Sequence, residues 1–369
     1  MGETPSDTRP GDVAVALTLR RTGHVEQLVG RDARAEWVEP GFELPLAPDA
    51  DPPYSETYQM ALWSPSSHVG VWWHLTYATL GVAGLWEQQF TLAFPGDRYL
   101  LCKTFNEGVR HGQRLSVGGL TVSIDKPLDA WSLVYRGAGR VVSGAEMRAG
   151  SLVDGPHVPF TADLRLHAMS PPYDFGTHRL GNDSADAVSD IPAMSAKGHY
   201  EQDCLVTGRL TVGDDDINID GTCMRTRSWG TREYRGFGTS IYVHGQFRQS
   251  GRSFMAIRLQ PPGGPGFTSV VVGEPGRVTV GDAQGLPLAA TVDETESDYE
   301  FELTTAASTS VVRAEVLAAV RMTFVQRAET CMGSQRSAET HHDFVQAFTK
   351  FSWDGETGYG VTERAVDLQ

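Results

Sequence analysis

The chain has 369 residues, a formal net charge of −15, 40% hydrophobic residues and 21% charged residues. This composition can build a sizeable core and excludes a disordered chain. The acidic balance argues against a nucleic-acid partner and disfavours an anionic membrane surface, because both require a basic footprint. Residues 1–12 lack the apolar region of a signal peptide, and no stretch resembles a membrane span, so we expect a cytoplasmic protein.

The cysteines Cys102, Cys204, Cys223 and Cys331 lie far apart and form no Cys-x-x-Cys pair. This spacing disfavours a disulfide framework or a zinc knuckle. We expect reduced, mostly buried thiols.

Alternation of apolar and polar residues predicts strands along the chain, in order at 120–124, 131–135, 161–168, 205–212, 241–248, 253–259, 268–272, 299–303 and 344–353. Residues 312–322 fit either a helix or a long strand. Turn sequences rich in Gly, Pro and Asp separate these segments at the spacing typical of β-sandwiches and barrels. The predicted fold class is therefore all-β.

Residues 171–196 are the least regular stretch and are dominated by Gly, Pro, Ser and Asp. Such a composition predicts a linker or a long crossing loop. We expect an N-terminal β-domain at 1–175, a linker at 176–196 and a C-terminal β-domain at 197–369. The two domains would be consecutive barrels or strongly curved antiparallel sheets.

The first candidate site residues are Tyr54, Glu56 and Tyr58, which share one face if residues 54–58 form a strand. A buried carboxyl between aromatic rings would have a raised pKa and could donate a proton. Alternatively, Glu56 is exposed and the tyrosines simply pack.

A dense aromatic region follows, with Trp63, Trp72, Trp73 and Trp86. Most of these rings should be core, but Trp72 and Trp73 could line a cavity for an apolar ligand. The same region could instead form a subunit interface, so a homodimer is one expected assembly.

His199, Glu201 and Asp203 would share one strand face. Three ionisable groups on one face could form an acid–base set. Alternatively, they pair with arginines on a neighbouring strand.

Arg225, Arg227 and Trp229 also share one face if residues 224–229 form a strand, and Arg232 and Tyr234 follow. Guanidinium groups can hold an oxyanion, and an indole offers its face to a cation or a polyene. Alternatively, an Arg–Trp stack closes the end of a barrel.

Further candidates for substrate contact are Tyr242 and His244, on the polar face of 241–248, and Trp353 near the C-terminus. His341, His342 and Asp343 suggest a metal, but no third ligand is apparent and we expect none. Phosphate-binding loops, serine nucleophile elbows and dinucleotide motifs are absent from the sequence, so we expect no cofactor.

The segment 198–232 resembles the AttH and carotenoid 1,2-hydratase (CrtC-type) lipocalin-like proteins. The similarity lies in Gly198-His199-Tyr200-Glu201-Gln202, in Asp220-Gly221 and in Arg225-Thr226-Arg227-Ser228-Trp229-Gly230-Thr231-Arg232. Residues 353–363 look like the closing strand of that family, and residues 54–58 fit an early segment more loosely. This chain has Thr226 where the family pattern has aspartate.

The resemblance implies two lipocalin-like β-barrels and a large, mostly apolar small-molecule substrate. We expect a cofactor-independent enzyme that cyclises, isomerises or hydrates a polyene, terpenoid or polyketide-like compound. Glu201, Arg227, Arg232 and Trp229 are the expected catalytic residues, with Glu201, Glu56 or Asp203 supplying the acid that Thr226 cannot. The alternative is a non-catalytic carrier of a hydrophobic small molecule.

Overall fold

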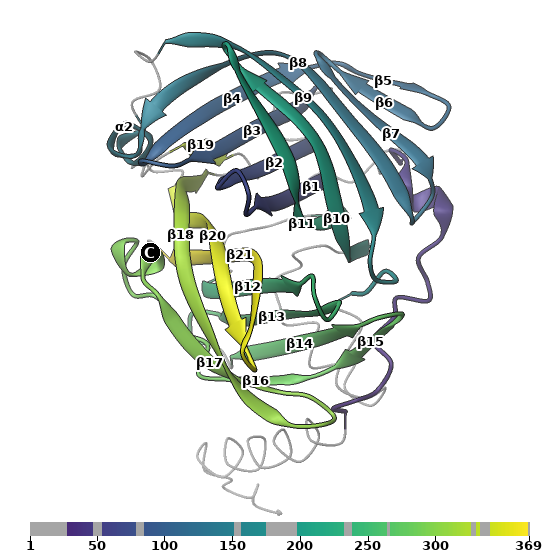
Figure 1. Cartoon of the computed structure of the whole chain (residues 1–369), viewed down its shortest axis with the longest axis vertical. Coiled ribbons are helices and arrows are strands. Elements are labelled where there is room, and N and C mark those ends of the chain that lie inside the picture. The colour runs from purple at the N-terminus through teal and green to yellow at the C-terminus, as the bar shows by residue number, and fades with distance from the viewer. Residues whose placement is uncertain are drawn as a thin grey trace, which may run out of the picture.

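The computed structural model describes residues 28–46, 54–78, 85–150, 156–174, 198–231, 238–263, 266–325, 330–332 and 340–367. These residues form two β-barrels that lie one above the other along the long axis of the molecule (Figure 1). The predicted all-β class and the two consecutive barrels are thus confirmed.

The first sheet has eleven strands in the order β4-β3-β2-β1-β11-β10-β9-β8-β7-β6-β5. An additional pairing of β4 with β8 closes eight of them into a barrel. Their bounds are β1 (Tyr54–Ser64), β2 (Val69–Ala78), β3 (Trp86–Phe94), β4 (Arg98–Asn106), β5 (Gly108–His111), β6 (Arg114–Val117), β7 (Leu120–Lys126), β8 (Ala130–Ser143), β9 (His157–Ala168), β10 (Gly198–Val212) and β11 (Asp215–Thr231).

The second sheet has ten strands and forms a nearly closed nine-stranded barrel in the order β15-β14-β13-β12-β21-β20-β18-β17-β16, with β19 paired to β18. Its bounds are β12 (Thr239–Phe247), β13 (Arg252–Gln260), β14 (Phe267–Glu274), β15 (Arg277–Val280), β16 (Asp282–Gln284), β17 (Tyr299–Thr304), β18 (Thr309–Val325), β19 (Thr330–Met332), β20 (Thr340–Trp353) and β21 (Glu356–Asp367). The helical elements among the described residues are α2 (Gly144–Ala149) and the short 3-10 turns η1 (Pro40–Glu43) and η2 (Asp293–Glu296).

Sheet membership does not follow the expected division of the chain at 176–196. β10 and β11 pair with β9 and β1, so residues 198–231 complete the first barrel rather than begin the second. The change of sheet falls between β11 and β12. The segment 175–197, which holds the expected linker, lies outside the described residues.

The ambiguous segment 312–322 is a strand, within β18. The two ends of this segment pack in different places. Val312 and Ala314 pack inside the second barrel, whereas Val320 and Met322 pack against the first barrel. A register shift between Val316 and Ala318 separates the two ends. Such a bulge bends a strand and lets it serve both environments.

The three largest hydrophobic clusters of the described residues occupy different parts of the molecule. One fills the interior of the first barrel, one fills the interior of the second, and a third lies between the barrels. The third cluster exists because alternate residues of the facing strands point out of their own barrel and toward the other. Trp63 and Phe348, with ring centroids 5.9 Å apart, make one such contact.

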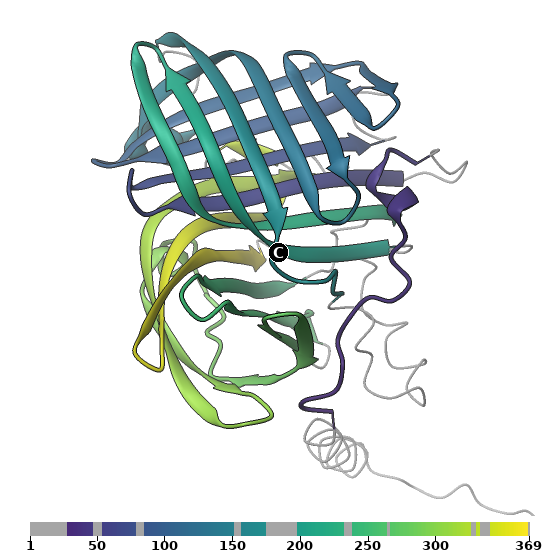
Figure 2. The same ribbon diagram turned by 45° about the vertical axis from the view of Figure 1, so that its right-hand side comes forward.

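Residues 28–46 form a strap that links the two barrels (Figure 2). Gly30 and Ala33 donate backbone hydrogen bonds to Val280 and Val278 of β15, and Ala35 donates one to Pro172. The strap then reaches the first barrel, where η1 places Glu43 inside it. One short segment therefore contacts both barrels.

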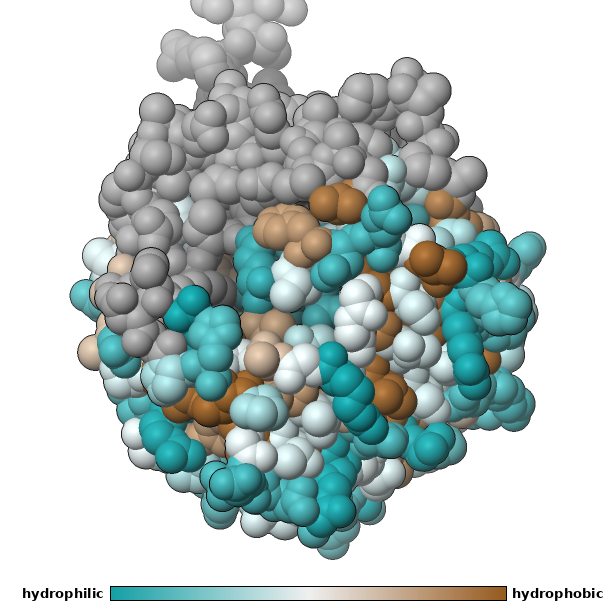
Figure 3. Space-filling model, turned by 90° about the horizontal axis from the view of Figure 1, so that it is seen from above, coloured by the Kyte–Doolittle hydropathy of each residue, from teal (hydrophilic) through white to brown (hydrophobic). Residues whose placement is uncertain are grey.

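The outer surface is mostly polar where Figure 3 shows it, and its hydrophobic residues stand in small separate groups. Across the described residues, the exposed large hydrophobic side chains are Phe105, Val109 and Val311. Trp72 and Trp73 are 2% and 4% exposed, so these rings are buried within the chain rather than offered to a second subunit.

Gly70 of β2 allows the ring of Phe348 from the second barrel to approach. A Cβ atom at Gly70 would lie 2.5 Å from the nearest carbon of that ring. We predict that Gly70→Ala lowers the free energy of unfolding by about 1–3 kcal/mol, because the added methyl overpacks the contact between the barrels. Urea denaturation measures the change.

The matched control is Gly41→Ala, because a Cβ atom at Gly41 would meet nothing within 4 Å. Shortening the partner with Phe348→Leu should recover part of the loss caused by Gly70→Ala. A double mutant whose stability equals the sum of the two single losses would contradict this packing account.

Candidate active site between the barrels

β10 and β11 form a wall with two chemically different faces. Their register pairs Tyr200 with Arg227 and Gln202 with Arg225, and these side chains point into the first barrel. The intervening pairs, Glu201 with Thr226 and Asp203 with Met224, point toward the second barrel. The acidic set therefore lies on the opposite face of the sheet from Arg225 and Arg227 and does not pair with them.

Arg227 is fully buried, and its guanidinium is satisfied within the first barrel. It forms an ion pair with Glu56 and donates hydrogen bonds to the backbone carbonyls of Phe42, Leu44, Thr57 and Ser228. Its charge also lies 4.1 Å from the ring centroid of Tyr58. These contacts are those of a clamp that holds the strap in the mouth of the barrel.

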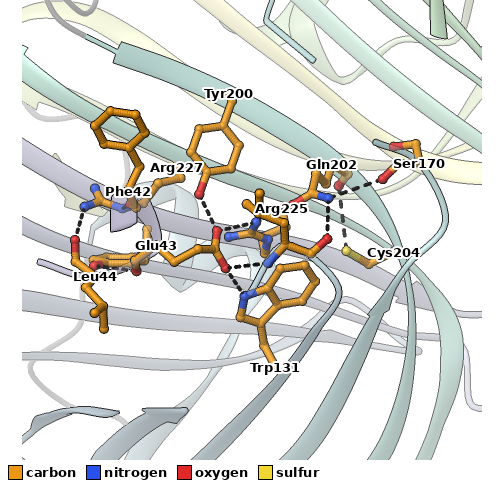
Figure 4. Close-up of polar contacts among 12 residues, drawn as sticks. Phe42, Glu43, Leu44, Trp131, Ser170, Tyr200, Gln202, Cys204, Arg225 and Arg227 are labelled. Atoms are coloured by element: carbon orange, nitrogen blue, oxygen red, sulfur yellow. Dashed lines mark hydrogen bonds and ion pairs between the residues drawn. The ribbon is translucent and has the colours of Figure 1, made fainter. Parts of the chain in front are cut away.

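Arg225 lies beside this clamp and is neutralised by Glu43 from the strap, at 2.8 Å (Figure 4). Glu43 also accepts hydrogen bonds from Tyr200 and Trp131, and the guanidinium of Arg225 stacks 3.9 Å from the Trp131 ring centroid. Burial works to raise the pKa of Glu43, but Arg225 and these hydrogen bonds outweigh it and lower the pKa.

Aromatic rings close the same end of the barrel. Trp229 stacks on Phe42 with ring centroids 5.0 Å apart, and it packs with Tyr54 and Tyr200. Glu56 is buried, accepts a hydrogen bond from Tyr54, and burial raises its pKa despite Arg227. The structure thus brings together Tyr54, Glu56, Tyr58, Arg225, Arg227 and Trp229, as a closed end of the first barrel.

The opposite face of the wall carries Glu201, which is only 2% exposed. The hydroxyl of Tyr242 on β12 donates a hydrogen bond to it at 2.8 Å, and His199 Nε2 lies 3.3 Å from its other oxygen. Burial raises the pKa of Glu201 to about 7, although His244 and Tyr242 act in the other direction. This carboxyl can therefore gain or lose a proton near neutral pH.

A second carboxyl, Glu363 of β21, shares this region. It pairs in register with Tyr242 and accepts a 2.8 Å hydrogen bond from Gln59 of the first barrel. Burial, with a smaller contribution from Glu201, raises the pKa of Glu363 to about 7. Sequence reasoning missed Glu363 as a site residue, although it ends the segment 353–363 that resembles the family.

Asp203 and His244 form a hydrogen-bonded pair in the same region as Glu201 and Glu363. Asp203 Oδ1 lies 2.7 Å from His244 Nε2, and Asp203 also accepts hydrogen bonds from Tyr173 and Ser253. Burial would raise the pKa of Asp203, but the hydrogen bond and charge of His244, with those hydroxyls, lower it. The other ring nitrogen of His244 has no hydrogen-bond partner, so the imidazole is held by one nitrogen and free at the other.

The remaining predicted residues divide between environments. Trp72 lies at the barrel interface and stacks on His74 with ring centroids 5.3 Å apart. Trp73 lies inside the first barrel, and Trp353 lies inside the second under Arg252. Arg232 and Tyr234 lie outside the described residues.

Among the described residues, no group of three or more His, Cys, Asp or Glu side chains is placed to hold a metal ion. In the same part of the chain, no helix is long and apolar enough to cross a membrane. Cys102, Cys204 and Cys223 are free and buried, as expected.

Residues 39–366 match the domain of unknown function DUF7064, so the chain belongs to that family. No curated protein matches the sequence significantly.

Among solved structures, a putative AttH from Nitrosomonas europaea is similar with a TM-score of 0.53 and 12% identity, over 88% of this chain and 99% of that one. CghA is similar with a TM-score of 0.53 and 12% identity, over 93% of this chain and 98% of that one, and its structure with Sch210972 gives 0.52. At this identity the likeness concerns the fold, and it confirms the resemblance to AttH-type proteins at that level.

The raised pKa of Glu201 predicts an unusual pH dependence of stability. Between pH 4.5, its ordinary value, and about 7, the unfolded chain loses this proton while the folded chain keeps it, so stability falls as pH rises. Glu201→Gln removes this contribution. We predict that the stability of the variant relative to the parent rises by up to about 3 kcal/mol between pH 4.5 and 8, measured by denaturant unfolding.

Asp203→Asn is the opposite control. The pKa of Asp203 is lowered in the folded state, so its charged form contributes stability that is lost only as pH falls through that value. The variant should be less stable than the parent at neutral pH, with a gap that narrows in acid. A pH-independent difference for Glu201→Gln would contradict the buried, neutral carboxyl.

Proposed function

We propose that this protein is a cofactor-independent enzyme that moves a proton on a bulky, mostly apolar small molecule held between the two barrels. The reaction class is cyclisation, isomerisation or hydration at a double bond. Its substrate would be a polyene, terpenoid or polyketide-like compound. The active groups are those that β10, β12 and β21 direct into the space between the barrels.

One observation carries the proposal: two carboxyls on facing sides of the barrel interface, the buried Glu201 and the half-buried Glu363, have pKa values of about 7. Burying a carboxyl without an ion partner is costly and contributes nothing to a structural core. Strongly shifted titratable groups concentrate at functional sites, where acid–base chemistry needs a pKa near the working pH.

Thr226 also supports Glu201 as the acid. The register places Thr226 directly opposite Glu201 on the adjacent strand, on the same face. Directly opposed side chains have Cβ atoms about 4.5–5.5 Å apart. The carboxyl of Glu201 can therefore reach nearly the same place as the aspartate that the family pattern has at position 226.

The roles follow from the contacts. Glu201 in its protonated form donates a proton to the substrate, and Tyr242 and His199 fix its orientation. His244, anchored by Asp203, presents its free nitrogen as the second acid–base group. Trp72, Met224, Met255 and Phe348 supply apolar contacts for the substrate body.

The arginines take a supporting part in this proposal. Arg225 and Arg227 are ion-paired inside the first barrel, so they hold the strap and the wall on which Glu201 stands. Arg232 is kept as a candidate for carbonyl contact. The fold is also similar to that of CghA, which has been crystallised with Sch210972.

A carrier of a hydrophobic small molecule is the second candidate. Its support is the apolar cluster between the barrels, which a ligand could share. A carrier, however, has no use for two carboxyls that titrate near neutral pH, so the enzyme is the better account.

A strain that makes the natural substrate provides the functional test. Deleting the gene should cause a metabolite to accumulate, and purified protein added to the organic extract should convert it to an isomer or to a product heavier by one water. We predict that Glu201→Gln abolishes this conversion, followed by liquid chromatography and mass spectrometry, while the variant still melts cooperatively.

Glu302→Gln is the matched control, because Glu302 lies exposed on the outside of β17. It should convert the metabolite at the parental rate. Retention of the metabolite without conversion by the parent protein would favour the carrier, and conversion by Glu201→Gln at the parental rate would remove Glu201 from the mechanism.

A further inference from the structure

Gln346 of β20 is buried in a manner that is rare for a polar side chain. It is 0% exposed, and neither its amide nitrogen nor its amide oxygen has a hydrogen-bond partner. The nearest comparison among the described residues is Gln88, a buried amide inside the first barrel that lies beside the Tyr135 hydroxyl. Because an unpaired buried amide is costly, each such group requires an explanation.

The location of Gln346 supplies one. It stands beside Glu363 in the register of β20 and β21, and Tyr242 follows on the next strand. On its other side Val320 of β18 offers only an apolar side chain. Gln346 therefore belongs to the face that carries the acid–base groups.

We infer that Gln346 determines substrate specificity by binding an oxygen function of the substrate, a carbonyl or a hydroxyl, next to the reacting carbon. This inference rests on the proposed function and narrows its substrate class. Pure hydrocarbon polyenes are excluded, and oxygen-bearing terpenoid or polyketide-like compounds remain.

The chemistry of the amide supports this class. Its nitrogen donates to a carbonyl oxygen, and its oxygen accepts from a hydroxyl, so either group pairs with it. A hydrocarbon would leave the amide unpaired, and sites built to hydrogen-bond a ligand discriminate strongly against analogues that lack the group. The free nitrogen of His244 on the same sheet face adds a second polar contact that a hydrocarbon could not use.

The same argument explains why Gln346 is tolerated without a partner. A group that is satisfied only when the substrate is bound lowers the stability of the free protein and raises affinity for the right ligand. The nearly isosteric Gln346→Met should therefore stabilise the free protein, raising its melting temperature by about 1–3 °C.

Binding tests use two fluorescent probes of matched shape. One is the aryl ketone 6-propionyl-2-(dimethylamino)naphthalene, whose emission shifts to longer wavelength when its carbonyl accepts a hydrogen bond. The other carries a propyl chain in place of the propionyl group. We predict that the parent prefers the ketone about tenfold, and that Gln346→Met removes this preference and the emission shift.

Gln88→Met is the matched control, since it changes a buried amide inside the first barrel and should leave both affinities unchanged. Two results would overturn the inference while leaving the enzyme proposal intact. One is an unchanged ketone preference in Gln346→Met, and the other is a lower melting temperature of that variant. Failure of the parent to bind either probe would overturn both proposals.

Discussion

The alternation of side chains along β10 and β11 is the constraint on which the rest of the structure depends. Because successive residues point to opposite faces, one strand pair places Tyr200, Arg225 and Arg227 in the first barrel and Glu201 in the space beside the second. A shift of one residue in register would exchange the two sets. The charged groups that stabilise the first barrel and the carboxyl proposed for catalysis are therefore neighbours in sequence, but they lie on opposite faces of the sheet.

The two faces treat buried charge differently. Inside the first barrel, Arg225 and Arg227 each meet a carboxylate; Arg225 also donates a hydrogen bond to Gln202, and Arg227 donates to several backbone carbonyls. Between the barrels, Glu201 and Glu363 accept hydrogen bonds, but among the described residues neither carboxyl forms an ion pair with an arginine or a lysine. With pKa values of about 7, both carboxyls stay mostly protonated and uncharged in mildly acidic solution. The strap of residues 28–46 contacts both barrels and so helps to fix the distance between the two halves of the site.

Local pattern predicted much of this arrangement, including the strands and the shared face of Arg225, Arg227 and Trp229. It could not predict which barrel β10 and β11 join, because strand pairing with β1 connects residues far apart in sequence. Glu363 and Gln346 escaped notice because a polar residue on an alternating strand looks solvent-exposed until a second barrel covers it. The contact between Asp203 and His244 likewise crosses from one sheet to the other. In each case the missing information was the docking of one barrel on the other.

Carboxyl titration of the folded protein by NMR, with isotope-labelled glutamate and Glu201→Gln as the assignment variant, tests the central claim most directly. The account predicts a Glu201 signal that titrates with a pKa of about 7 instead of the ordinary value of 4.5. A Glu201 signal that titrates with the ordinary pKa would show a solvated carboxyl. That result would contradict the assignment of the acid–base site to the barrel interface.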